Sequence, residues 1–345
     1  MNRMKYDLFK NFFGAGISPI WFLRKNEVPI FMFHRVLSSN NTNKPIDKYI
    51  YIEEDKFEQV LITLKKYFQI SCLKTYLEQK FIPDNKCCFI TFDDGWIDNY
   101  TVAFPILKKY NIPATIFIPT GMIGTKLSFW FSRLEEMINS SNNLDNLSAI
   151  FRNHFRFLNK KNETGSIKEE LYFNVCNFLK KMDLSSINRT LDHIESDINL
   201  KKNELEERVL IDWEEVEEMG KHKISFGSHC VNHSILPNLH RIDKKFEINQ
   251  SRKDLLDKKV NFVNCLSFPN GNYDQETLNI ATEAGYSLFL SASHNKCGEG
   301  YSPRLAHRIN ITNYNSEKSS LFFSLFKAKI KKPFFKVSEP YLKND

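Results

Sequence analysis

The chain has 345 residues, of which 42% are hydrophobic, so it can bury a large core and is neither fibrous nor disordered. Its net charge of +7 comes from lysines and arginines spread along the sequence, which argues against nucleic-acid binding and favours an anionic glycan or an anionic membrane face. The seven cysteines have no regular spacing and several lie in apolar runs, which favours a reducing compartment over a disulfide framework.

Residues 1–27 combine short apolar pieces with charges such as Lys10 and Arg24. No run reaches the ~20 residues needed to span a bilayer, and no signal segment with a cleavage site is present. We expect an N-terminal helical segment packed on the protein, or alternatively an amphipathic helix over about 8–23 on a membrane surface. The predicted location is cytoplasmic, with possible peripheral contact to the membrane.

Short apolar runs alternate with segments of helical spacing along most of the chain. The predicted strands are 28–36, 87–92, 113–119, 224–229, 264–271 and 286–293. The predicted helices are 56–67, 99–110, 212–222 and 274–285. Repeated strand–helix units predict a parallel α/β architecture, in which functional groups gather at the carboxyl ends of the strands.

The pattern changes between 126 and 206, where several amphipathic helical pieces occur without a clear strand. We interpret this region as a helical insertion that serves as a lid or a partner surface. The α/β domain then comprises 28–125 and 207–325, and residues 326–345 form a C-terminal tail.

Polar residues follow the predicted strands at several points. The run CCFITF ends in the adjacent carboxylates Asp93 and Asp94, and another strand ends in the sequence SHCVNH. His229 and His233 are four residues apart, which on one helical turn places both imidazoles on the same face, close enough to share a metal ion. One aspartate is expected to bind that metal, while the other takes a proton from water. Alone, however, Asp-Asp-Gly is a common turn and His-x3-His is often structural.

The segments TFDDGW (91–96) and SHCVNH (228–233), with FMFHRV (31–36) and SFPNGNYD (267–274), resemble the polysaccharide deacetylases, the carbohydrate esterases of the NodB homology domain. The resemblance covers about 28–125 and 207–312. It implies a distorted, incomplete (β/α) barrel with a helical insertion. It also implies a divalent metal, most often Zn²⁺, with Co²⁺, Ni²⁺, Fe²⁺ or Mn²⁺ as alternatives. The implied reaction is the hydrolysis of an N-acetyl, less often an O-acetyl, group on a sugar.

By matching position, the resemblance makes Asp93 the catalytic base. It assigns the metal to three ligands: Asp94, His229 and His233. In the third motif it places Pro269 and Asn270 beside the oxyanion, which the backbone N–H of Asn270 helps to hold.

The general acid has two candidates. The sequence LAH (305–307) makes His307 the acid, but HRINI (307–311) also fits a variant in which Arg308 is the landmark and His307 is incidental. His34, at the end of the first strand, is the alternative acid. Trp96 and Tyr273 are expected to stack on sugar rings, although core packing explains most aromatic residues as well.

Three positions depart from the family pattern. Cys230 replaces a hydroxyl residue and is either a small substitute or a soft extra ligand. Ser267 stands where the family usually has an arginine that braces the base, and Asn270 stands where it usually has an aromatic residue. The base therefore needs another partner for its orientation.

We expect a metal-dependent N-deacetylase whose substrate is an N-acetylated glycan, a lipid-linked sugar or a nucleotide sugar. The first rival is a glycan-binding protein of the same fold whose third motif has disabled the site. The second is a non-haem Fe(II) enzyme, which also uses two histidines and a carboxylate. The sequence leaves the oligomeric state undetermined.

Overall fold

The computed structural model describes residues 27–79, 86–141, 143–155, 166–198, 208–292, 298–317, 320–321, 324–325 and 335–336. Within them, parallel strands form a curved sheet in the order β11-β10-β9-β8-β7-β6-β2-β12. In chain order these strands are β2 (Ile30–Phe33), β6 (Cys87–Phe92), β7 (Ala114–Ile118), β8 (Ile224–Ser228), β9 (Phe262–Ser267), β10 (Leu288–Ser291), β11 (Leu305–His307) and β12 (Ile309–Asn310).

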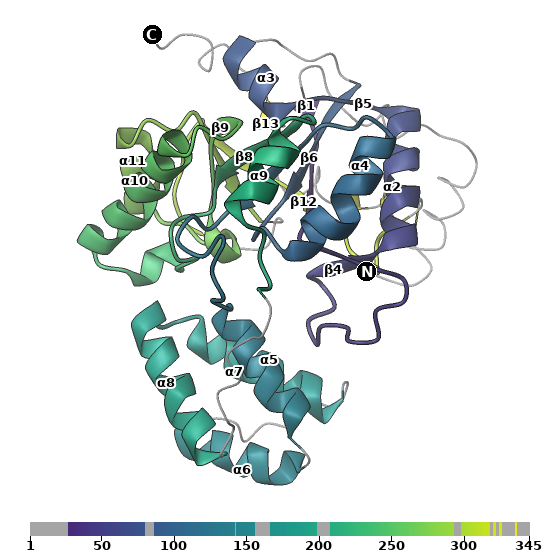
Figure 1. The fold of residues 1–345 in the computed structure, drawn as a ribbon. Coiled ribbons are helices and arrows are strands. Elements are labelled where there is room, and N and C mark those ends of the chain that lie inside the picture. Colours follow the sequence, from purple (N-terminus) through teal and green to yellow (C-terminus); the bar gives the residue numbers. More distant parts are fainter. Residues whose placement is uncertain are drawn as a thin grey trace, which may run out of the picture.

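The two edge strands of this order, β11 and β12, are separated in the chain only by Arg308. The sheet therefore curls into a nearly closed barrel (Figure 1). Its strands are continuous apolar runs because both faces are covered, as β6 shows with six buried residues. The predicted distorted (β/α) barrel with a helical insertion is confirmed.

Short strand pairs add to this barrel. β1 (Glu27–Val28) pairs with β13 (Phe335–Lys336), β3 (Arg35–Leu37) pairs with β4 (Tyr51–Glu53), and β5 (Gln69–Ile70) lies on β6. The helices associated with the barrel are α2 (Glu54–Tyr67), α3 (Leu73–Gln79), α4 (Phe104–Lys109), α9 (Trp213–Gly220), α10 (Arg241–Asp257) and α11 (Gln275–Glu283). A π-helical turn, η2 (Asn99–Ala103), precedes α4, and Pro105 lies in the first turn of α4.

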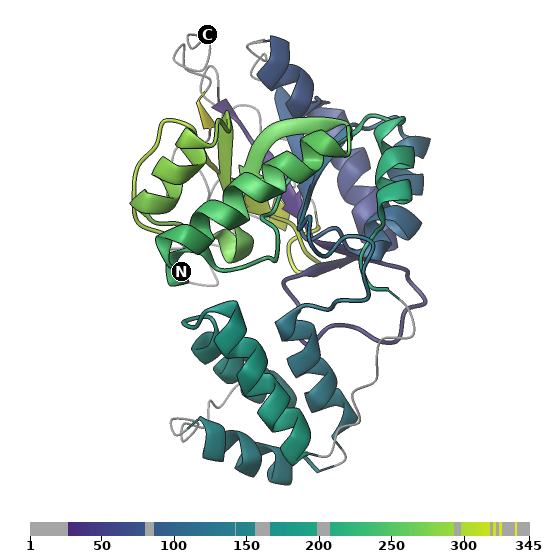
Figure 2. The ribbon, with the colours of Figure 1, turned by 60° about the vertical axis from the view of Figure 1, so that its left-hand side comes forward.

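Between β7 and α9 the chain leaves the barrel and forms a helical lobe (Figures 1 and 2). Its helices are α5 (Trp130–Ser140), α6 (Leu144–His154), α7 (Ile167–Leu179) and α8 (Leu184–Asp197). They enclose a hydrophobic cluster of their own, to which Leu134, Phe151, Val175 and Leu191 belong. Each helix turns its apolar stripe toward that cluster, so the lobe has a core separate from that of the barrel.

The chain re-enters the barrel through a capped helix. The side chain of Asp212 accepts a hydrogen bond from the backbone N–H of Glu215, and the Glu215 carboxylate accepts one from the N–H of Asp212, as the capping-box pattern predicts. Just before this cap, the N–H of Ile211 donates to the carbonyl of Gly95. The start of α9 thus holds the loop that follows β6.

Among the described residues, no helix combines the length and apolar character that crossing a bilayer requires. The predicted amphipathic helix at 8–23 lies outside the described residues, as do most of the segments 1–27 and 326–345.

Candidate metal centre and active site

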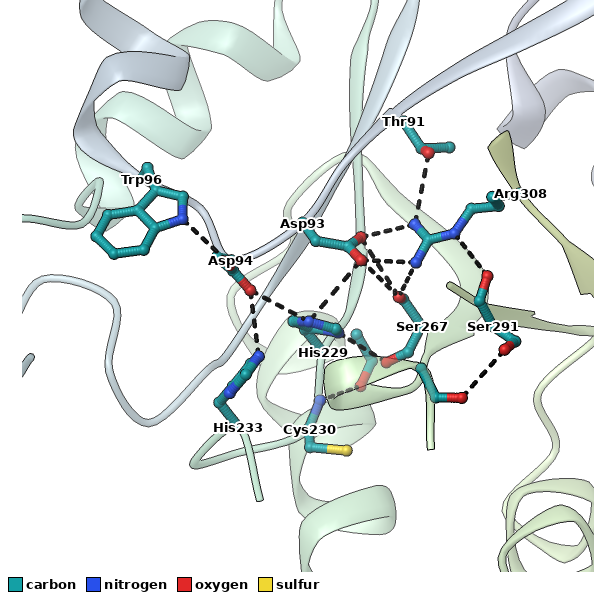
Figure 3. A network of polar contacts seen from close by, with 12 residues as sticks. Thr91, Asp93, Asp94, Trp96, His229, Cys230, His233, Ser267, Ser291 and Arg308 are labelled. Carbon is teal, nitrogen blue, oxygen red and sulfur yellow. Dashed lines mark hydrogen bonds and ion pairs between the residues drawn. The ribbon is translucent and has the colours of Figure 1, made fainter. Parts of the chain in front are cut away.

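Three buried side chains meet at the carboxyl ends of β6 and β8 (Figure 3). Oδ1 of Asp94 lies 3.3 Å from Nε2 of His229 and 3.2 Å from Nε2 of His233. One ligand atom from each residue lies within 4.8 Å of the others. Two imidazole nitrogens and one carboxylate oxygen at this spacing match a three-ligand catalytic zinc site with open positions.

The two histidines do not lie on a helical turn, so that part of the prediction is wrong. After β8 the chain forms an irregular loop in which Cys230 has φ 66° and His233 has φ 57°. These left-handed conformations break a helix, yet they still bring both Nε2 atoms to Asp94.

Glu247 of α10 holds this metal loop, residues 229–233, in place. Its carboxylate accepts hydrogen bonds from the backbone N–H groups of Val231 (2.8 Å) and Asn232 (2.9 Å), and from Oγ of Ser234 (2.8 Å). Glu247 is 4% exposed, so these charge-assisted bonds form away from water. The sequence analysis did not identify Glu247. α10 carries many charged residues, and their pattern does not show which carboxylate is buried against the loop.

The tautomer of His229 is fixed by its second nitrogen. Nδ1 lies 2.8 Å from the carbonyl oxygen of Ser267, which can only accept, so Nδ1 donates. In the neutral ring the Nε2 lone pair then faces a carboxylate oxygen of Asp94. Two lone pairs in contact repel each other, so the arrangement fits a cation between them.

The surrounding charges favour a positive charge at this point, whether a proton on His229 or a metal ion. Burial lowers the pKa of His229, but the charges of Asp93 and Asp94 outweigh burial and raise that pKa above its usual value. Burial lowers the pKa of His233, which favours its neutral form. Burial opposes ionisation of Asp94, yet the contacts from both histidines outweigh it and the pKa of Asp94 lies well below its usual value. The site therefore attracts positive charge while keeping a carboxylate ligand ionised.

Asp94 is oriented by Trp96, whose Nε1 donates to Oδ2 of Asp94 at 2.9 Å and leaves Oδ1 facing the histidines. The Trp96 side chain packs against Phe129 and is only 2% exposed. The expectation that Trp96 stacks on a sugar is therefore wrong for this structure, since no open ring face remains. Trp96 instead orients Asp94, a candidate metal ligand.

Asp93 lies beside the three ligands, and its carboxylate forms a two-pronged ion pair with Arg308 at 2.7 and 2.6 Å. Oγ of Ser267 lies 3.2 and 3.3 Å from the same carboxylate. Burial raises the pKa of Asp93, but Arg308, with smaller effects from His229 and His34, outweighs burial and lowers it. Asp93 is thus an ionised, oriented carboxylate whose Oδ2 lies 4.0 Å from Nε2 of His229.

Arg308 is the partner that orients the Asp93 carboxylate, which the sequence did not identify. It stands between β11 and β12, is fully buried, and also donates from Nε to the carbonyl oxygen of Ser291 at 3.1 Å. Arg308 orients the Asp93 carboxylate, the role expected of an arginine at position 267, where this chain has serine. Arg308 lies 41 residues further along the chain and also contacts Ser267.

A cavity of about 200 Å³ opens onto this cluster. His34 and Asn270 line it together with Asp93, Asp94, His229 and His233. His307, Pro269 and Tyr273 are not among the described residues that line it; Tyr273 is buried against Phe268, with ring centroids 5.5 Å apart. The structure thus brings His34, rather than His307, to the cavity.

Cys230 is fully buried in an apolar cluster with Leu236 and Leu266. Burial raises the pKa of its thiol well above the usual value, which opposes the thiolate form that binds metals. The geometry therefore favours the small-substitute interpretation of Cys230 over an extra metal ligand.

Comparisons with known proteins agree with this geometry. The family model described as "Polysaccharide deacetylase" matches residues 82–289. YxkH of Bacillus subtilis (strain 168), a relative named for this family, is 23% identical over 289 residues, 83% of this chain and 72% of YxkH. A poly-beta-1,6-N-acetyl-D-glucosamine N-deacetylase of Staphylococcus aureus (strain N315) is 33% identical over 113 residues, 29% of this chain but only 39% of that protein.

Solved structures show the same fold. The Streptococcus pyogenes deacetylase PplD, in complex with acetate, aligns with a TM-score of 0.51 at 20% identity, covering 90% of this chain and 100% of PplD. IcaB from Ammonifex degensii aligns with a TM-score of 0.52 at 16% identity, covering 87% of this chain and 97% of IcaB. Because the family model spans more than half of the sequence, including Asp94 and both histidines, this chain belongs to the polysaccharide deacetylase family.

Proposed function

We propose that this protein is a metal-dependent N-deacetylase that hydrolyses the acetamide of an N-acetylated sugar in a glycan, releasing acetate and leaving a free amine. One observation carries the proposal: Asp94, His229 and His233 converge within 4.8 Å beside an ionised, braced Asp93. This set provides both a cation site and a base next to one cavity.

A zinc ion held by the three ligands would lower the pKa of water and polarise the acetyl carbonyl. Asp93 accepts the proton of the attacking water, and Arg308 keeps its carboxylate ionised and aimed at the site. The backbone N–H of Asn270, at the cavity wall, is the proposed donor to the oxyanion.

An amide nitrogen leaves poorly unless it is protonated, so the reaction needs a general acid. We assign this role to His34, because its side chain lines the cavity whereas that of His307 does not. The proton of His34 passes to the departing sugar amine.

The rival function is a glycan-binding protein without catalytic activity. It is suggested by Ser267 and Asn270, which replace the usual arginine and aromatic residue of the third motif. This argument for the rival is weaker because Arg308 and Ser267 together hold the Asp93 carboxylate, so the missing arginine is replaced. The S. aureus relative suggests a polymer of N-acetylglucosamine as the first substrate to test.

The test measures acetate released by zinc-loaded protein from a β-linked N-acetylglucosamine oligomer, a lipid-linked N-acetylated sugar and a nucleotide sugar. We expect release from at least one of the three, loss on treatment with a chelator, and recovery with zinc. Binding of the oligomer without acetate release from any of the three would favour the rival. A preference for either precursor would support action on the cytoplasmic side of a membrane, the location that we propose.

A further inference from the structure

The helical lobe forms one wall of the active-site cavity. The barrel supplies the candidate metal site and His34. The lobe supplies the facing residues, from α5 and from α7 with its C-terminal cap. These facing residues are Trp130, Phe131, Tyr172, Phe173, Cys176 and Lys180. A substrate that reaches Asp93 therefore contacts the lobe as well as the barrel.

The lobe wall is tied to the barrel at defined points. Nδ2 of Asn238, shortly after the metal loop, donates to the backbone carbonyls of Lys180 (2.8 Å) and Met182 (2.9 Å). Lys180 caps the C-terminal end of α7 and Met182 lies in the turn that follows, so Asn238 satisfies carbonyls that have no helical partner. On the other side, the backbone N–H of Ile46 donates to the Glu135 carboxylate of α5 at 2.5 Å. Both contacts hold the lobe wall against the barrel end that carries the candidate metal site. Figure 2 shows the lobe lying beyond this end of the barrel.

Lys180 carries a positive charge that this wall does not neutralise. Its ammonium makes no ion pair or hydrogen bond with another described residue, although it lies at the cavity. Of the carboxylates that share the cavity, Asp93 is paired with Arg308 and Asp94 faces the two histidines. The third, Asp47, accepts the N–H of Tyr49 through Oδ1 and keeps its charge, but among the described residues no ion pair joins it to Lys180. The lysine charge is therefore available to a ligand.

The same wall offers apolar surface beside that charge. Phe131 and Phe173 are partly exposed and contact the rings of Trp130 and Tyr172, which are buried, as is Cys176. Aromatic rings next to a single polar group are a common arrangement in small-molecule pockets, where the rings hold the ligand and the polar group selects it.

We propose that Lys180, with the partly exposed aromatic wall of the lobe, forms a second substrate subsite that binds an anionic group of the glycan, a carboxylate or a phosphate, near the N-acetylated sugar. This inference rests on the proposed deacetylase function and adds the class of substrate. The favoured glycan carries an acidic group within a sugar or so of the acetamide that is hydrolysed.

The experiment compares Lys180→Met, Lys180→Arg and the control Lys181→Met, which changes the neighbouring, exposed lysine. Each zinc-loaded variant is given a neutral N-acetylglucosamine oligomer, an N-acetylated oligosaccharide containing a uronic acid, and one containing a phosphodiester. KM and kcat are measured for each.

We expect wild-type protein to have a lower KM for at least one acidic substrate, and Lys180→Met to raise that KM by about tenfold or more, the effect of losing one hydrogen bond to a charged group. Lys180→Arg should retain most of the preference, and Lys181→Met should keep it. Lys180→Met should raise the KM for the neutral oligomer by much less than the KM for the acidic substrate, and Lys181→Met should react with the neutral oligomer as wild type does. The acidic substrate whose KM responds to Lys180→Met shows whether the subsite binds a carboxylate or a phosphate.

Equal KM values for neutral and acidic substrates in wild-type protein would overturn the proposal. So would a Lys180→Met effect that is the same on all three substrates, which would indicate a structural role. If no substrate releases acetate, the proposed function fails instead, and binding of the same oligosaccharides to wild type and Lys180→Met, measured by calorimetry, still decides the subsite.

Discussion

At the scale of single residues, the proposed base Asp93 depends on its pairing with Arg308. Both side chains are buried, and two short hydrogen bonds fix the carboxylate plane. Lysine carries the same charge but cannot form this planar, two-pronged contact.

We therefore expect Arg308→Lys to lower kcat about 100-fold while zinc binding is kept, because a misaligned base loses proximity to the reacting atoms. Steady-state kinetics and metal analysis on the same preparation check this. Arg304→Lys, at a half-buried arginine four residues earlier, serves as the control. An Arg308→Lys protein with wild-type kcat would show that the brace is dispensable.

The choice between two general acids is also a question of single residues. His34→Gln should lower kcat about 10²–10⁴-fold without loss of zinc, since it removes the proton donor for the leaving amine. His307→Gln should change kcat by less than about threefold, because His307 does not line the cavity. The opposite ranking in parallel kinetics would return the role to His307.

At the scale of elements, α10 organises the metal loop through one buried carboxylate. Glu247→Gln keeps the shape of the side chain but weakens the bonds to Val231, Asn232 and Ser234. Zinc affinity should fall about 10–100-fold, as for other residues that orient metal ligands. The free energy of unfolding should fall by about 1–2 kcal/mol.

A zinc titration against a competing chelator and a urea unfolding curve measure both effects. Glu283→Gln, at an exposed position on α11, should change neither. Unaltered zinc affinity in Glu247→Gln would mean that the loop keeps its shape without this carboxylate.

The elements also show how far the sequence leads. Buried strands such as 87–92 and 224–228 are predictable because their runs are apolar and end in polar residues. Those strand ends supply the candidate aspartates and histidines, and the family resemblance selects Asp94 as the ligand. The metal loop was misjudged as helical because positive φ at Cys230 and His233 has no marker such as glycine. Arg308 and Glu247 acquire their roles only through long-range contacts, which a single sequence does not encode visibly.

At the scale of the whole molecule, the barrel and the helical lobe have separate hydrophobic cores, and the three proposed metal ligands all belong to the barrel. A ligand that binds only the folded state stabilises it, by about 2.7 kcal/mol at a concentration 100 times its Kd. Zinc should therefore raise the unfolding midpoint of the protein.

Thermal unfolding with zinc, with a chelator and in Asp94→Asn measures this stabilisation. The chelator should lower the midpoint of wild-type protein, and Asp94→Asn should respond to neither treatment. A wild-type midpoint that is insensitive to zinc would indicate that the folded protein does not hold zinc.

The most direct test of the account compares zinc content and acetate release in wild-type protein, Asp93→Asn and Asp94→Asn. The account predicts that Asp93→Asn retains zinc while turnover falls about 10²–10⁴-fold, because only the base is lost. Asp94→Asn should lose both zinc and turnover. Full turnover by zinc-loaded Asp93→Asn, or zinc and activity retained by Asp94→Asn, would contradict the division of roles between the two adjacent carboxylates.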